Sequence, residues 1–180
     1  TLLMQRQDLD GALAEMVAAT ELEPDDGKFF ESLGCVQIDA TGWQAARQSF
    51  EKAIELGWRT ASCFTNRGRA RENLGDQSGA LEDFNRAVEI GGDPRAIENR
   101  ALLRANMGDH RGALDDLNII LQSDPDNVNH LMVRATLRGK RGDLKGARAD
   151  YRRAKKIEPD EPQLEQIKLF LDSKGLPRRH

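Results

Sequence analysis

The sequence is poor in aromatic residues and in cysteine, and it contains no long apolar run. Only 5% of its 180 residues are aromatic and 38% are hydrophobic, below the usual share of about 45–50%. We therefore expect a core built from small and aliphatic side chains. No apolar run approaches about 18 residues, so no membrane span is expected. Cys35 and Cys63 lie in separate apolar segments and do not suggest a disulfide framework.

The sequence also lacks the patterns that carry out catalysis. Its three histidines are scattered, with no cysteine or carboxylate at metal-ligand spacing, and neither a phosphate loop nor a nucleophile elbow is present. We predict a non-enzymatic protein with no cofactor, metal or small-molecule substrate. Reduced cysteines and the absence of a visible signal peptide favour a cytoplasmic location. Because the chain starts like the middle of a helix, we expect upstream sequence to have been removed.

What the sequence has instead is an internal repeat. Five segments superpose on alanines spaced 33 or 34 residues apart: Ala12, Ala46, Ala80, Ala113 and Ala147. Small residues lie twelve positions before the last four, at Gly34, Gly68, Ala101 and Ala135. Turn glycines lie between, at Gly42, Gly75, Gly108 and Gly142. Larger residues lie four positions after the alanines, at Met16, Phe50, Phe84, Leu117 and Tyr151. This pattern predicts two helices per unit that cross closely at the small residues.

These spacings and the Pro-terminated second helices resemble the tetratricopeptide repeat family over nearly the whole chain. We expect complete repeats at 27–60, 61–93, 94–127 and 128–161. A partial repeat at 1–26, mainly a second helix, precedes them, and a C-terminal capping helix at 162–175 and a tail at 176–180 follow. The resemblance implies an all-α fold, a right-handed α-solenoid of stacked antiparallel helix pairs. It also implies a protein-interaction scaffold or adaptor that docks a partner's peptide or helix in a concave groove of the superhelix.

In this family the first helix of each pair lines the groove. First-helix side chains that packing does not use are therefore expected to face a partner: Glu31, Cys35, Ser62, Thr65, Asn66, Arg69, Asn73, Arg95, Glu98, Asn99, Leu102, Asn106, Asn129, Met132, Thr136 and Lys140. The equivalent residues Asn66 and Asn99 either pair with a peptide backbone or bond helix to helix, and both alternatives stay open. The lysine and asparagine clamp that some members use for a chaperone's C-terminal carboxylate is absent, so that activity is not expected.

Three repeats share an arginine and an aspartate that the fourth lacks. The predicted pairs are Arg67 with Asp83, Arg100 with Asp116, and Arg134 with Asp150. The repeat at 27–60 has Leu33 and Ser49 in their places. Because the two charges occur together and are absent together, we predict a structural ion pair within each unit rather than an arginine ladder for an acidic ligand.

The net charge of −3 hides an uneven distribution. Residues 8–31 contain eight acids and one base, whereas residues 134–156 contain ten bases and two acids. Five of these bases form a basic stripe along one predicted helix: Lys145, Arg148, Arg152, Lys155 and Lys156. The stripe is an alternative site for an acidic protein, an anionic membrane or nucleic acid, although we favour a solvated end or contacts with Asp160, Glu161 and Glu165. A further alternative is self-association as a structural scaffold, with the acidic start meeting the basic end.

Overall fold

The structure is a computed structural model that describes residues 2–91 and 93–175, with side chains placed for 8–91 and 93–174. These residues form ten α-helices and no strand, which confirms the prediction of an all-α fold. No helix among them is both long and apolar enough to cross a bilayer. The chain divides into two compact units, unit 1 at residues 1–99 and unit 2 at residues 100–180, and each is described by itself.

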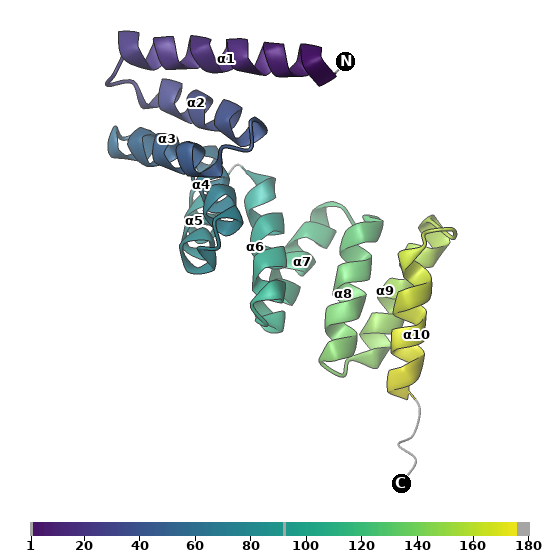
Figure 1. Ribbon diagram of the computed structural model, residues 1–180. Helices are drawn as coiled ribbons and strands as arrows, with labels where there is room; N and C mark the ends of the chain where they lie inside the picture. The colour runs from purple at the N-terminus through teal and green to yellow at the C-terminus, as the bar shows by residue number, and fades with distance from the viewer. Residues whose placement is uncertain (1, 92, 176–180) are drawn as a thin grey trace. The chain divides into compact units, whose positions relative to one another are not determined.

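Unit 1 contains five helices and the start of a sixth (Figure 1). They are α1 (Leu2–Leu22), α2 (Gly27–Asp39), α3 (Trp43–Glu55), α4 (Ala61–Asn73), α5 (Gln77–Ile90) and the first residues of α6 (Pro94–Asn106). Each helix from α1 to α4 packs on the next along the chain. One apolar cluster surrounds Phe50 between α2, α3 and α4, and a second includes Phe64 on α4 and Ala96 on α6.

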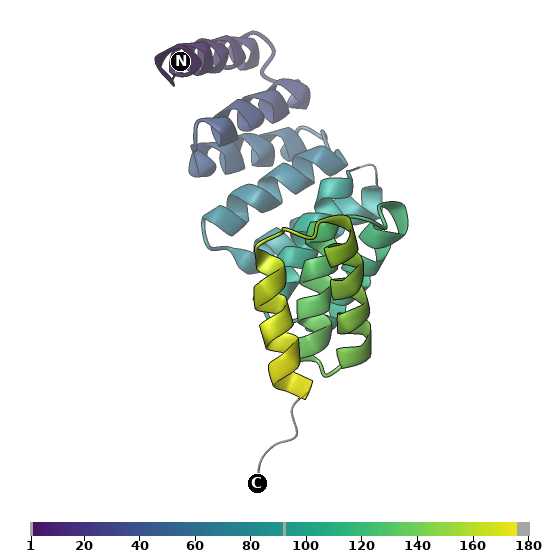
Figure 2. The same cartoon turned by 90° about the vertical axis from the view of Figure 1, so that its right-hand side faces the viewer.

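Unit 2 contains the rest of α6 and four further helices. They are α7 (His110–Ser123), α8 (Val128–Lys140), α9 (Leu144–Ile157) and α10 (Gln163–Gly175). One cluster joins Ala101, Leu117 and Leu137 from α6, α7 and α8, and another spans α7 to α10. In both views α10 lies beside α8 and α9 (Figures 1 and 2).

The helices of a pair cross where the sequence predicts, with a small residue against a large one. A Cβ atom added to Gly34 would lie 2.7 Å from Cε1 of Phe50, and one added to Gly68 would lie 2.7 Å from Cε1 of Phe84. Gly139, which has no role in the repeat pattern, also permits a close helix crossing, here between α8 and α10. A Cβ atom there would lie 2.6 Å from Cε1 of Phe170, so this glycine lets α10 pack closely on α8.

The turns within the pairs follow one design in three repeats. Gly75, Gly108 and Gly142 have φ values of 85°, 84° and 87°, and the aspartate that follows each glycine caps the second helix. The prediction that Gly42 has the same role is wrong, because its φ is −83° and it makes no side-chain cap. Thr41 takes the left-handed conformation instead, with φ 57°. The register of the turn sets which position is left-handed, and here that position holds threonine.

Candidate functional site

The helix α10 continues the pattern of the first helices. Its Leu164, Ile167 and Leu171 are buried, 34 residues after His130, Val133 and Leu137 of α8. By the same spacing, Gln163, Gln166, Phe170 and Lys174 correspond to the predicted groove residues Asn129, Met132, Thr136 and Lys140. By register, α10 therefore acts as a further first helix as well as covering the end of unit 2.

All of these corresponding side chains except Lys174 line a cavity in unit 2 with a volume of about 480 Å³. Six of the predicted groove residues line it: Leu102, Asn106, Asn129, Met132, Thr136 and Lys140. Sequence reasoning missed the other lining residues, Ala105, Val133, Leu137, Gln163, Gln166, Ile167 and Phe170. The 34-residue spacing could have identified the contribution of α10. The volume lies within the range that ligand pockets have, about 300–1,000 Å³.

The lining of this cavity is apolar in the middle and polar toward its ends. Met132 is buried and Phe170 is half-buried, whereas Leu102 keeps 42% of its surface exposed. Four amide side chains line the cavity as well: Asn106, Asn129, Gln163 and Gln166. Lys140 is the one charged residue among the described lining residues. Such a surface can bury an apolar side chain while amide groups bond a peptide backbone.

The predicted groove residues of unit 1 lie in a different environment, because they bond to one another. The expectation that Thr65 faces a groove is wrong, since the residue is fully buried and its hydroxyl donates to the Ala61 carbonyl. Asn66 is 4% exposed, and its amide lies 3.5 Å from both Cys35 Sγ and Ser62 Oγ. Its oxygen accepts a hydrogen bond from Arg69. For Asn66, helix-to-helix bonding is therefore the alternative that the structure shows.

Other polar residues predicted to face the groove in unit 1 are also bonded within the unit. The Glu31 carboxylate accepts hydrogen bonds from Trp58 Nε1 and Thr60 Oγ1, which attaches α2 to the segment between α3 and α4. Arg95 pairs with Asp93, and Asn73 donates to the Arg69 carbonyl. On α6, Glu98 is exposed and Asn99 is half-buried.

Each predicted arginine and aspartate pair is in direct contact. Two guanidinium nitrogens of each arginine bond the two carboxylate oxygens, at 2.9 and 2.6 Å for Arg67 and Asp83. The distances are 3.0 and 2.6 Å for Arg100 with Asp116, and 3.0 and 2.8 Å for Arg134 with Asp150. All three aspartates are at most 4% exposed. These arginines therefore hold the fold together, and their guanidinium groups are engaged by carboxylates.

A second arginine joins each aspartate, which sequence reasoning missed. Arg71, Arg104 and Arg138 lie four residues after the first arginines, and each lies 2.7–3.0 Å from its aspartate. Burial raises the pKa of the Asp83 carboxyl although both guanidinium groups oppose that change. In the first complete repeat the equivalent contact is neutral, because Ser49 Oγ lies 2.7 Å from Gln37 Oε1. The equivalent place is thus filled by a charged network in three repeats and by a neutral hydrogen bond in the first complete repeat.

The basic stripe lies on α9, on the side opposite the buried residues Ala147, Asp150 and Ala154. Arg148 is half-buried and the other four residues of the stripe are exposed. Among the described residues, no carboxylate forms an ion pair with any of the five. The expected contacts with Asp160, Glu161 and Glu165 are therefore not formed, and Glu165 pairs with Lys168 instead. Arg153, beside the stripe, pairs with Asp126 at 2.8 Å.

The chain consists of repeated helix pairs that cross closely at small residues and present one side of their first helices. These features define the class, which is that of α-solenoid interaction proteins. The tetratricopeptide repeat family model matches residues 31–95 and 99–162. The chain therefore belongs to the tetratricopeptide repeat family, whose fold generally mediates protein–protein interaction and whose members are generally non-enzymatic scaffolds.

Tetratricopeptide repeat protein 36 is similar to part of the chain. The Homo sapiens protein is 38% identical over 78 residues, which are 43% of this chain and 40% of that protein. The Xenopus tropicalis protein is 38% identical over 87 residues, 47% of this chain and 39% of that protein. The chain thus spans about 40% of the length of these relatives.

Solved structures show the same fold. YrrB, described as a tetratricopeptide repeat protein with an unusual peptide-binding site, is 24% identical with a TM-score of 0.80, covering 93% of this chain and 87% of that one. The pilF protein of Pseudomonas aeruginosa is 18% identical with a TM-score of 0.78, covering 94% of this chain and 78% of that one.

Proposed function

We propose that this protein is an adaptor that binds a segment of another protein in the cavity of unit 2. The observation that carries the proposal is the difference between equivalent side chains in the two units. In unit 1 most groove side chains bond to neighbouring residues of the unit, as at Thr65 and Asn66. In unit 2 they surround an open, mostly apolar cavity formed by three first helices. The peptide-binding site named for YrrB is consistent with a role of this kind.

Two exposed apolar residues of unit 2 provide a matched test. Leu102 lines the cavity and is 42% exposed, whereas Ile119 on α7 lies outside it and is 44% exposed. Changing either residue to lysine adds the same charge at similar exposure. A protein captured by the parent chain and then purified should bind Leu102→Lys at least tenfold more weakly, and Ile119→Lys within about twofold of the parent. Circular dichroism would establish that both variants keep their helices.

The basic stripe supports a second candidate function, the binding of an acidic partner, because its five cations have no ion-pair partner among the described residues. Arg152 and Arg153 are adjacent and exposed, but only Arg153 is paired. Arg152→Glu should weaken binding of an acidic partner and reduce its salt dependence, and Arg153→Glu should have the smaller effect. Equal affinities and equal salt dependence for the parent and Arg152→Glu would argue against this candidate.

A further inference from the structure

The polar residues of the unit 2 cavity are distributed unevenly between its two ends. The first turns of α8 and α10 provide the amides of Asn129, Gln163 and Gln166, whereas the fourth amide, Asn106, ends α6 and corresponds by spacing to Lys140. The last turns of these helices provide Lys140 and Lys174, which correspond to each other by the 34-residue spacing. Lys140 lines the cavity, and Lys174 Nζ lies 5.7 Å from the ring centre of Phe170, which also lines it. We call this the lysine end of the cavity.

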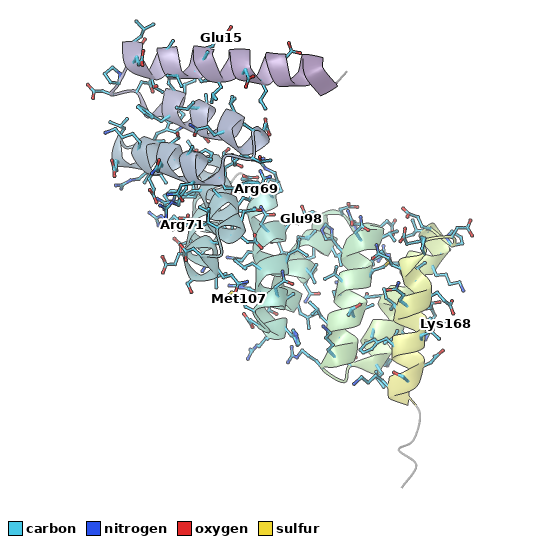
Figure 3. The ribbon with its side chains drawn as sticks, in the orientation of Figure 1. Glu15, Arg69, Arg71, Glu98, Met107 and Lys168 are labelled. Atoms are coloured by element: carbon cyan, nitrogen blue, oxygen red, sulfur yellow. The ribbon has the colours of Figure 1, made fainter. Side chains whose placement is uncertain are left out.

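Among the residues that the structure describes, no carboxylate pairs with the lysines of the lysine end. No Asp or Glu is among the described residues that line the cavity, and no ion pair forms to Lys140 or Lys174 within the described chain. By contrast, Lys168 pairs with Glu165 at 3.5 Å on the same helix and is labelled on α10 in Figure 3. The two unpaired lysines therefore remain available to an anion from outside the chain.

We infer that the partner segment carries a bulky apolar side chain followed, toward the lysine end, by an acidic side chain. The apolar side chain would pack on Met132, Ile167 and Phe170, and the carboxylate would lie between Lys140 and Lys174. The amides at the other end would bond the backbone as the segment continues out of the cavity. The anion is taken to be a side-chain carboxylate, and a peptide with a free C-terminal carboxylate tests the other source. This inference rests on the proposed function, because it names the chemistry of the segment that the cavity binds.

The dimensions of the cavity set the length of the probe. Asn129 and Lys140 are eleven residues apart on one helix, or about 16 Å, which an extended peptide spans with about five residues. The probes are therefore pools of seven-residue peptides, acetylated and amidated at their ends, with leucine fixed at the centre. Each pool has Glu, Gln or Lys fixed two residues before or after the leucine, and mixed residues elsewhere. Retention on the immobilised full chain is measured at low and at physiological salt.

One Glu pool should be retained about three- to tenfold more than its Gln counterpart, and the Lys pools least. The double variant Lys140→Gln/Lys174→Gln should abolish this preference. The control Lys155→Gln/Lys156→Gln removes the same charge from the basic stripe of α9 and should preserve it. A pool with a free C-terminal carboxylate in place of Glu should show no such gain.

Equal retention of the Glu and Gln pools, or a preference that survives in Lys140→Gln/Lys174→Gln, would overturn the inference. The lysines would then serve only to balance the partial negative charge at the helix C-termini. If the Gln pools still depended on Leu102, the proposed function would stand while the inference failed. If no pool were retained, or if Leu102→Lys changed no retention, both would fail.

Discussion

At the scale of single residues, burial decides which polar groups are available for chemistry. Cys63 is fully buried, and its thiol lies 3.8 Å from the Phe50 carbonyl. Burial raises the pKa of this thiol from 9.0 to about 12, with a smaller contribution from the Glu31 carboxylate. The half-buried Cys35 thiol also has a raised pKa, mainly through burial. Both cysteines are therefore thiols, not thiolates, at neutral pH.

The Cys63 thiol should resist alkylation in the folded protein. In the variant Cys35→Ser, iodoacetamide at pH 8.5 should modify Cys63 roughly a thousandfold more slowly in buffer than in urea, because only the thiolate reacts. The stability that this raised pKa provides is fully present below pH 9 and is lost as pH rises from 9 toward 12, since the unfolded chain loses its proton first. Similar alkylation rates in buffer and in urea would contradict this account.

The stability of the fold with a buried aspartate should depend strongly on the arginines that pair with it. The repeat at 27–60, which has a neutral hydrogen bond in the same place, shows which residues can replace the charged ones. Asp83→Ser alone leaves Arg67 and Arg71 without their carboxylate and should cost about 3–5 kcal/mol. The triple variant Arg67→Leu/Arg71→Gln/Asp83→Ser copies the residues Leu33, Gln37 and Ser49. It should unfold in urea within about 1 kcal/mol of the parent, because the raised pKa of Asp83 indicates a large desolvation cost. A triple variant as unstable as Asp83→Ser would refute this explanation.

At the scale of helices, two residues act together at the start of a second helix. Asp76 caps α5 by accepting a hydrogen bond from the Gly79 N–H at 2.9 Å, and a Cβ atom at position 79 would clash with the Asp76 carboxylate. Asp109 with Gly112 and Asp143 with Gly146 show the same arrangement. Each aspartate that caps a second helix therefore occurs with a glycine three residues later, whereas Gly42 occurs with Ala45.

This coupling predicts a background-dependent effect of one substitution. In the parent, Gly79→Ala should change stability little, because the gain in helix propensity is offset by loss of the cap. In an Asp76→Ala background, the same change should stabilise by about 0.5–1 kcal/mol, since no carboxylate is displaced. Urea unfolding of the four proteins gives the coupling directly, and an equal gain in both backgrounds would exclude it.

The spacing of the sequence predicts the helices and their crossings well because both are local or repeated features. Gly34 against Phe50 and Arg100 against Asp116 follow from residue types that recur at fixed offsets. The availability of a groove residue does not follow in this way, because it depends on what the neighbouring helix contributes. Asn66 contacts Cys35 on α2, whereas Asn129 lines an open cavity, although both are predicted from the sequence to face the groove.

At the scale of the molecule, charge and polarity divide along the chain. The exposed acids Asp8, Asp10 and Glu15 lie on α1, and Glu15 projects from the side of α1 opposite α2 in Figure 3. The five cations of the basic stripe and the two lysines of the lysine end lie in unit 2, on α8, α9 and α10. Within unit 2, the cavity combines an apolar centre, backbone-bonding amides and positive charge, which are the features that a peptide segment requires.

The most direct test of this account is the affinity of a purified binding partner for three proteins: the parent, Leu102→Lys and Ile119→Lys. Isothermal titration should show at least a tenfold loss for Leu102→Lys and less than a twofold change for Ile119→Lys, because only Leu102 lines the cavity. Unchanged affinity for Leu102→Lys, or an equal loss in both variants, would contradict the claim that the unit 2 cavity binds the partner.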